Sequence, residues 1–511
     1  MLKSVFKKSF IVLLIVISGK VFSFLRDIMI SWKFGSGLET DAYFAANNVP
    51  SILFAAIVSS YLVLFIPLYN KVLINEGQEK VDVFVSNLLS IFFIGSILLS
   101  TVGYFSMDFL IDFVAPGFNQ ETRLLAVKFG RVLVLSFAFS SSSLILSNVS
   151  NARNVYYAPH IIPLISSIIV IVGIFFFGDN YGPLAMAVSG VLAFVIILGI
   201  QWYLAKGFFN FNFIINLRDT NLKKMTWLVA PIFIGFSIDQ LNLLVNTAVA
   251  SGLGEGSLSA LTFSQRLQGT ISGTISTSII TVLYPIISKL YVEKKDRDLI
   301  YLTKVSLKLI FILLFPTTIY LAVYSSEFVK IIYYRGEFDL LDVKNTATVF
   351  SAYSINVLFL ALREIILRLY YIKEKTKIPL YTSVISLGLN AGLSIFLSNH
   401  IGLLGLSVAN LIATFINLLI MYLLINRKLN FSLRVKDSLL YLVNITMPCI
   451  IFLGLIVVDN SLFMVKEGVS MFVLKLIVYN LLFVLTLVLF KNKETLMLFK
   501  LLRNKINGNK K

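Results

Sequence analysis

Three basic residues interrupt long apolar stretches of this sequence, at Lys20, Arg26 and Arg266. A Lys or Arg at the centre of a membrane helix costs roughly 2.5–3.5 kcal/mol, so such residues usually face a bundle interior or an aqueous cavity. Lys20 and Asp27 are seven residues apart and share one helical face, with Ser23 between them. This spacing allows a buried Lys20–Asp27 pair, side chains that extend from the helix end to the membrane interface, or a cavity-lining Lys20. We expect Lys20, Arg26 and Arg266 to be the only deep cations in the two equivalent helix sets that the internal repeat described below predicts.

Arg266 stands in a stripe of small and polar residues on one predicted helix face, made of Thr262, Arg266, Gly269, Thr270, Gly273 and Thr277. Small-residue stripes often serve helix–helix packing, but such packing does not need a guanidinium group. Arginine offers a planar fork of donors that suits phosphate oxygens. The stripe therefore predicts a cavity that receives an anionic substrate, and we expect Asn48 to lie at the equivalent place on another helix.

An intramembrane carboxylate, Asp239, is accompanied by Gln240, Asn242 and Asn246. Such a carboxylate is by default a proton or cation site, or else the partner of an arginine such as Arg266. Further oxygens come from Asn390, Ser394 and Asn410, and together with Asp239 they would suit a weakly held Na⁺. We expect no other metal and no cofactor, since the sequence has a single cysteine, two distant histidines and no ATP-binding loop.

These residues must be positioned by membrane-spanning helices. Of the 511 residues, 58% are hydrophobic and 14% are charged, well below the roughly 25% charged residues of soluble domains. A spanning helix needs roughly 20 apolar residues. We predict fourteen spans, at residues 9–31, 42–70, 83–107, 124–149, 157–178, 182–206, 226–251, 258–288, 302–325, 343–372, 379–398, 401–425, 437–459 and 471–490.

The net charge of +18 comes mostly from Lys and Arg in the gaps after even-numbered spans and in the C-terminal tail. This distribution follows the positive-inside rule and argues against nucleic-acid binding. It predicts a multi-pass protein of the bacterial inner (cytoplasmic) membrane with both termini in the cytoplasm.

The two halves of the sequence contain an internal repeat. Residues 66–71 (IPLYNK) resemble residues 284–289 (YPIISK), Gly117 matches Gly336, and Pro159 matches Pro379, at offsets of 218 to 220. Because each repeat has six spans, the halves share one orientation in the membrane. The predicted fold is thus an all-α polytopic membrane protein with about 14 transmembrane helices, in two parallel-repeat six-helix lobes plus two extra C-terminal helices. We place the lobes at 1–208 and 225–428, a cytoplasmic linker at 209–224, and the extra helices with a basic tail at 429–511.

Several motifs resemble the MurJ/MviN lipid II flippase family of the multidrug/oligosaccharidyl-lipid/polysaccharide exporter superfamily. They are residues 19–27 (GKVFSFLRD), 34–37 (FGSG), 40–44 (TDAYF), 115–118 (APGF), 266–267 (RL), 334–338 (YRGEF) and 375–379 (KTKIP). The run F-G-x-G-x-x-T-D-A is fairly specific, and the motifs cover nearly the whole chain.

The resemblance implies two six-helix lobes that open alternately to each side and move lipid II, an undecaprenyl-diphosphate-linked peptidoglycan precursor, to the outer leaflet. It implies substrate contacts by Lys20, Arg26, Asp41 and Arg266, to which the repeat offset of 218 adds Asn48, and it allows for association with cell-wall synthesis enzymes. One departure follows Pro50, where the family has two arginines and an acidic turn but this chain has residues 51–56 (SILFAA).

This departure leaves open a relative that moves another polyprenyl-diphosphate-linked glycan, such as an O-antigen or capsule unit. A glycan polymerase or ligase is disfavoured because such enzymes need a large outer catalytic loop, and every outer gap here is short. A drug/cation antiporter is disfavoured because its cavity would be dominated by carboxylates. The expected function is therefore transport of a lipid-linked glycan within the bilayer, not an enzymatic reaction.

Overall fold

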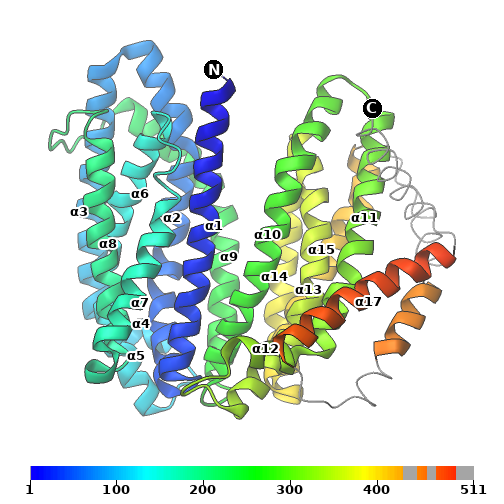
Figure 1. The fold of residues 1–511 in the computed structure, drawn as a ribbon. Helices are drawn as coiled ribbons and strands as arrows, with labels where there is room; N and C mark the ends of the chain where they lie inside the picture. The colour runs from blue at the N-terminus through cyan, green and yellow to red at the C-terminus, as the bar shows by residue number, and fades with distance from the viewer. Residues whose placement is uncertain (1, 430–445, 457–467, 491–511) are drawn as a thin grey trace. The chain divides into compact units, whose positions relative to one another are not determined.

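The structure is a computed structural model that describes residues 2–429, 446–456 and 468–490. Every regular element among those residues is a helix (Figure 1). The chain forms two compact units, the first made of Met1–Phe263 with Tyr333–Asp342, and the second of Ser264–Ile332 with the described residues from Val343 onward. The lobe boundaries at residues 208 and 225 stay a prediction.

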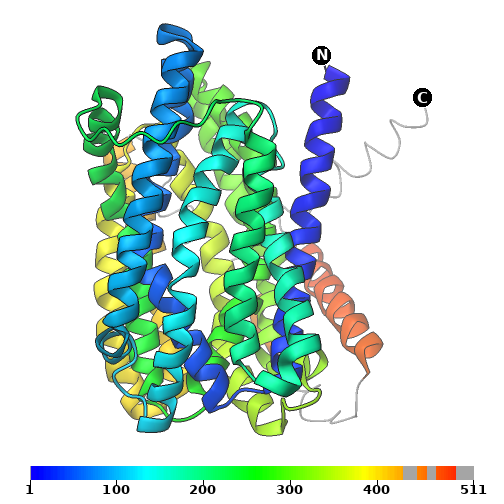
Figure 2. The ribbon, with the colours of Figure 1, turned by 90° about the vertical axis from the view of Figure 1, so that its left-hand side faces the viewer.

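The first unit contains helices that run up and down beside one another (Figure 2). They are α1 (Leu2–Phe34), α2 (Leu38–Glu76), α3 (Gln78–Phe105), α4 (Met107–Val114), α5 (Gln120–Leu133), α6 (Ser136–Ala152), α7 (Ile161–Tyr181), α8 (Leu184–Ala205) and α9 (Thr220–Ser251). The second unit is built from most of α10 (Ser257–Val292), α11 (Asp296–Val323), α12 (Ser325–Tyr333), most of α13 (Leu340–Ile372), α14 (Lys377–Ile401), α15 (Leu403–Leu429), the helix Thr446–Ile456 and α17 (Val469–Leu489).

The predicted spans coincide with these helices. Among the described residues, ten helices are each long and apolar enough to cross a membrane, and the α5–α6 pair, bent by 41°, makes an eleventh where the pair is counted as one broken span. The predicted first and eighth spans match α1 and α10, which have 33 and 36 residues. At about 1.5 Å per residue both exceed the roughly 30 Å of a hydrocarbon core. The helix Thr446–Ile456 lies within the predicted thirteenth span, so the all-α, polytopic prediction is confirmed.

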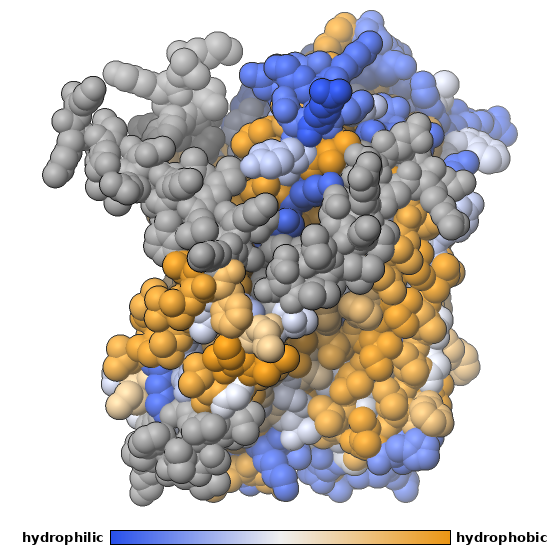
Figure 3. Space-filling view, turned by 90° about the vertical axis from the view of Figure 1, so that its right-hand side faces the viewer, coloured by the Kyte–Doolittle hydropathy of each residue, from blue (hydrophilic) through white to orange (hydrophobic). Residues whose placement is uncertain are grey.

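The surface agrees with a membrane environment. On the face shown in Figure 3, apolar side chains form a band and hydrophilic side chains gather at its two ends. Lipid tails cannot form hydrogen bonds, so the protein surface that contacts them has to be apolar.

Two short helices, α4 and α12, were not predicted from the sequence. They have eight and nine residues, too few to cross a membrane. In the first unit α4 is tied to α5 by the ion pairs Arg123–Asp112 and Arg131–Asp108. The hydrogen bond from Arg123 lowers the pKa of the Asp112 carboxyl, which favours its charged form.

The internal repeat is visible in the positions of the elements. The helices α3 and α11 begin at Gln78 and Asp296, and the short helices α4 and α12 begin at Met107 and Ser325, in both cases 218 positions apart. The α5–α6 pair and α13 begin 220 positions apart and end 220 positions apart. The duplication thus reproduces even the short helices.

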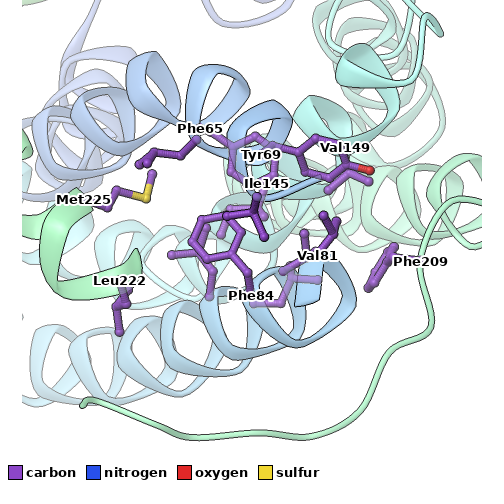
Figure 4. Packing of buried hydrophobic residues seen from close by; sticks show 14 of the residues in the cluster. Phe65, Tyr69, Val81, Phe84, Ile145, Val149, Phe209, Leu222 and Met225 are labelled. Carbon is purple, nitrogen blue, oxygen red and sulfur yellow. The ribbon is translucent and has the colours of Figure 1, made fainter. Parts of the chain in front are cut away.

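Buried side chains fix the helices that carry the candidate site. In the first unit, residues of α2, α3, α6 and α9 form one cluster with the linker after α8 (Figure 4). Its labelled members are Phe65, Tyr69, Val81, Phe84, Ile145, Val149, Phe209, Leu222 and Met225. In the second unit, aromatic side chains of α17 and of Thr446–Ile456 pack on α11, with Phe483 contacting both Phe315 and Phe452.

Candidate substrate and ion sites

Lys20 and Arg26 lie on α1 and are both half-buried. Arg26 pairs with the buried Asp27, with 3.2 Å between its Nη2 and Oδ1. Lys20 forms neither a hydrogen bond nor an ion pair with any residue that the structure describes. Asp27 thus pairs with its neighbour and not with Lys20, so the Lys20–Asp27 pair considered above is absent, and this favours a cavity-lining Lys20.

Asp41 is buried near the start of α2, and both of its carboxylate oxygens accept hydrogen bonds from protein donors. The Gly256 N–H donates to Oδ2 at 2.8 Å, while the N–H and Oγ of Ser259 donate to Oδ1 at 2.7 and 2.6 Å. These donors surround the first residues of α10, where a carboxylate also interacts favourably with the helix dipole. Asp41 therefore fixes the beginning of the helix that carries Arg266.

Asp41 belongs to a larger group of contacts in the first unit, which we call the turn cluster: residues 35–41, 251–259 and 336–342, with Trp32 and Gly117. The Ser36 N–H donates to Oδ2 of Asp342, and its hydroxyl donates to the Gly256 carbonyl. The Leu38 N–H donates to Oε1 of Glu255 at 3.1 Å. The α1–α2 turn is thereby bound to the α9–α10 turn, its repeat equivalent.

Asn48 lies on α2, half-buried, and its Nδ2 donates to the Thr247 hydroxyl of α9 at 3.0 Å. The preceding residue, Asn47, is exposed. Asn48 thus joins α2 to α9, and its equivalence to Arg266 in a superposition of the two lobes stays a prediction.

Arg266 is half-buried on α10, in the second unit. At Gly269 and Thr270, the stripe of small and polar residues around Arg266 does not pack against another helix. Both residues are exposed, and apart from the backbone of α10 itself and the two chain neighbours, no described heavy atom lies within 4 Å of where a Gly269 Cβ would be. Thr270 returns its hydroxyl to the Arg266 carbonyl. The stripe is therefore not closed by helix packing at these two residues. The side chain of Thr277 lies outside the described residues, and both the cavity interpretation of the stripe and the convergence of Arg266 with Lys20 and Arg26 stay predictions.

The predicted ion ligands are found in both units. Asp239 is exposed on α9 of the first unit. In the second unit, Asn390 and Ser394 are buried on α14, with 3.5 Å between Oγ of Ser394 and Oδ1 of Asn390. Asn410 on α15 accepts a hydrogen bond at 2.8 Å from Asn356 of α13. The second-unit residues are thus in two hydrogen-bonded pairs, and their assembly with Asp239 stays a prediction.

Charged residues on α13 were missed by the sequence analysis. Arg363 lies nine positions before the end of the helix, and it donates to Oδ1 of Asn417 at 3.2 Å and to the Ser383 hydroxyl at 3.4 Å. One turn further on, Arg368 pairs with Glu364 and lies over the rings of Tyr284 and Tyr371. The expectation that Lys20, Arg26 and Arg266 are the only deep cations of the two equivalent helix sets is therefore wrong for α13, although its sequence was a readable signal, with four charges within residues 343–372.

The position of the missing family arginines is filled by a packed aromatic pair. Phe54 is buried and stacks on Phe137 of α6, with ring centroids 4.0 Å apart and planes at 16°. At position 54, this chain therefore has an apolar contact between α2 and α6 where the family has charged residues.

Comparison with known proteins identifies the family of this chain. The sequence model of the family described as "Lipid II flippase MurJ" matches residues 30–478. A protein of Buchnera aphidicola subsp. Baizongia pistaciae (strain Bp), named "Probable lipid II flippase MurJ", is 26% identical over 473 residues, which are 90% of each chain.

Two solved structures show a similar fold. One titled "Lipid II flippase MurJ, inward closed conformation" has a TM-score of 0.80 at 24% identity and covers 94% of this chain and 99% of its own. An inward-facing multidrug resistance MATE family transporter of the MOP superfamily has a TM-score of 0.62 at 15% identity, over 79% and 93% of the two chains. With the family match extending from α1 to α17, this chain is a multi-pass membrane transporter that belongs to the lipid II flippase MurJ family.

Proposed function

We propose that this protein carries lipid II from the inner to the outer leaflet of the cytoplasmic membrane by alternating access. The observation that carries the proposal is the family match over residues 30–478, which includes both the end of α1 with its turn and the whole of α10. The relatives' name supplies the substrate, and the half-buried cations of α1 and α10 supply the chemistry that an anionic headgroup requires.

The cations would hold the diphosphate. A diphosphate carries at least two negative charges, and leaving these unpaired in a low-dielectric cavity would cost several kcal/mol. Charge-assisted hydrogen bonds, each contributing roughly 1.5–3 kcal/mol, offset that cost. Lys20, Arg26 and Arg266 would provide these bonds and Asn48 a neutral donor, while Asp41 would act indirectly by fixing the start of α10.

Transport would be coupled to Na⁺ or H⁺ without a bound cofactor. Asp239, with oxygens from Asn390, Ser394 and Asn410, would form the ion site. Asp239→Asn should then reduce transport and its dependence on the ion gradient, while the variant remains inserted in the membrane. Transport that keeps the wild-type dependence on the gradient would exclude this role, and Asp239 would then be better explained as the partner of Arg266.

The membrane orientation and partners belong to the same proposal. Both termini would face the cytoplasm, as the basic gaps indicate. The enzymes that make and polymerise lipid II are the partners that this function implies.

The direct test is complementation of a conditional flippase mutant, with an assay of outer-leaflet lipid II on the same membranes. We expect the wild-type chain to restore growth and outer-leaflet lipid II, and the Lys20→Ala, Arg266→Ala double variant at equal expression to restore neither. A well-expressed wild-type chain that leaves lipid II in the inner leaflet would refute the proposal. Full activity of the double variant would refute only the role of Lys20 and Arg266 in holding the diphosphate.

A further inference from the structure

The linker between α8 and α9 is bound to the side of α3. Figure 4 shows the chain between Phe209 and Leu222 passing around the outer side of the helix that carries Val81 and Phe84, and Figure 2 shows it crossing the face of the first unit. We call residues 209–217 the strap. Side chains at the start of α3 bond to its backbone: Ser86 to Asn210 and Asn212, Ser90 to Ile214, and Asn87 to Asn216.

Every backbone group of the strap that bonds to α3 belongs to an even-numbered residue. In non-helical, extended chain, side chains alternate between two faces with a period of two. Three of the four even-numbered residues are asparagines, at positions 210, 212 and 216. Of the odd-numbered positions, Phe209 is buried in the cluster of Figure 4, while Phe211, Phe213, Ile215 and Leu217 have exposed fractions of 39%, 64%, 53% and 67%. Beyond Phe209 the strap therefore has one largely polar face and one apolar face, and this apolar face is uncovered.

The residues next to the strap are of the types that are enriched at the membrane–water interface. Trp202 and Tyr203, in the last turn of α8, are exposed, and the Trp202 ring contacts the Phe211 ring at 5.4 Å. Trp and Tyr prefer the level of the lipid headgroups. Lys206 holds its Nζ 4.6 Å from the centre of the Tyr203 ring, and Arg218 follows the strap at its other end.

We propose that the strap is a lipid-binding element, which lies in the boundary of the membrane leaflet with its apolar face toward the acyl chains and with Lys206 and Arg218 on anionic headgroups. Irregular backbone is tolerated near lipid only where its polar groups are satisfied. Here α3 side chains bond to five of the eight backbone N–H and C=O groups of residues 210, 212, 214 and 216, and the remaining groups would lie at headgroup level, where water is present. The linker predicted as plain cytoplasmic chain is then part of the membrane-contacting surface.

The occupant of the apolar face is lipid because this face is continuous with surfaces that lipid must already cover. Val83 on α3 and Ile196 on α8, both in spanning helices, are exposed by 40% and 47%. Clustered basic residues add attraction to acidic lipids, since Lys223 and Lys224 follow Arg218 within six positions. This proposal does not depend on which substrate the transporter carries.

The test uses spin labels on the full-length chain in the Cys449→Ser background. Single cysteines are placed by Phe213→Cys on the apolar face and by Asn212→Cys on the polar face, with Ile215→Cys and Asn216→Cys as a second pair if a first variant does not fold. The proteins are reconstituted in vesicles with and without phosphatidylglycerol. Collision of each label with oxygen, which enters lipid, is compared with collision with a water-soluble nickel chelate.

We expect oxygen to dominate at positions 213 and 215 and nickel to dominate at positions 212 and 216, so that the ratio reverses between neighbours. Phosphatidylglycerol should raise the oxygen-to-nickel ratio at position 213, and Lys206→Gln with Arg218→Gln should abolish that rise. Dominance of nickel at 213 and 215 would overturn the proposal by placing the strap in water. Shielding of these positions from both reagents would overturn it in favour of a covering protein surface, and a ratio that ignores phosphatidylglycerol would overturn the headgroup contact.

Discussion

The α5–α6 pair and α13 are equivalent elements of the two repeats, but they differ in backbone and in chemistry. The first is bent by 41° between two helices, whereas the second is one continuous helix of 33 residues. Ser143 of α6 and Arg363 of α13 each lie 23 positions after the first residue of their element. Ser143 is fully buried and returns its hydroxyl to the Phe139 carbonyl of its own helix, while Arg363 reaches residues of α14 and α15.

The comparison shows that duplication preserved the path of the chain and not its side-chain chemistry. Small serines let α6 approach its neighbours closely, as small residues do in membrane helices. The charged residues of α13 instead join neighbouring helices by hydrogen bonds. The same difference holds between α2 and α10, where Asn48 and Phe54 of the first repeat correspond by the 218-residue offset to Arg266 and Ser272. At these two pairs of equivalent positions, 143 with 363 and 48 with 266, the cation therefore belongs to the second repeat.

The largest expected effect is at Arg266. Arg266→Ala should abolish lipid II flipping, and Arg266→Lys should restore it only in part because an ammonium lacks the planar fork. Asn48→Ala, the matched variant in the first repeat, should cost much less, since a neutral donor offers a weaker bond to phosphate. The measurement is the amount of outer-leaflet lipid II at equal expression of the variants. Equal losses for Arg266→Ala and Asn48→Ala would contradict the expectation that Arg266 contributes more to flipping than its repeat equivalent Asn48.

The next effect is on stability at the aromatic pair. Phe54→Arg should lower the free energy of unfolding by about 3–5 kcal/mol, because it places an uncompensated charge in the α2–α6 contact. Phe54→Leu, which keeps the site apolar, should cost far less. Thermal unfolding of the purified proteins in detergent measures both. If Phe54→Arg were as stable as wild type, position 54 would have to face a polar cavity.

A smaller loss is expected at the turn cluster. Asp41→Asn should lower the free energy of unfolding by about 2 kcal/mol, because an amide cannot accept all three hydrogen bonds and lacks the charge that suits a helix N-terminus. Ser259→Ala removes only the hydroxyl bond and should cost about 1 kcal/mol. Unfolding in detergent again provides the measurement. A Ser259→Ala loss greater than that of Asp41→Asn would contradict the assignment of Asp41 as the central acceptor.

The smallest effect sharpens the comparison of α6 with α13. Arg363→Leu should cost about 1 kcal/mol, since interhelical hydrogen bonds in membranes are individually weak. Ser143→Ala should be nearly neutral because its hydroxyl bonds within its own helix. In a double-mutant cycle, Arg363→Leu with Asn417→Leu should cost less than the sum of the two single variants. Additive losses would show that the 3.2 Å bond contributes nothing to stability.

Much of the fold could be predicted because membrane spans are long apolar runs and the repeat offset is nearly constant. The short helices α4 and α12 could not, because eight or nine residues give too little periodic signal. The donors to Asp41 come from a turn 215 residues away and leave no local pattern, although Ser259 is its repeat equivalent. Arg363 was readable as a charge within a predicted span, and the alternation of residues 210–217 was readable as an amphipathic strand pattern.

The turn cluster has a consequence for symmetry. Gly117 and Gly336 are equivalent, and so, at the same offset of 219, are Trp32 and Ser251. The Gly117 N–H donates to the Ser251 hydroxyl, while the N–H of Glu337, beside Gly336, donates to the Trp32 carbonyl. The same two regions thus meet twice with exchanged roles, as in an isologous interface between identical subunits, although the donor shifts by one residue and the acceptor changes from a hydroxyl to a carbonyl. A Cβ at either glycine would overlap the backbone of the opposite repeat, so this chain keeps a homodimer-like interface within a single polypeptide, with the smallest residue required on both sides.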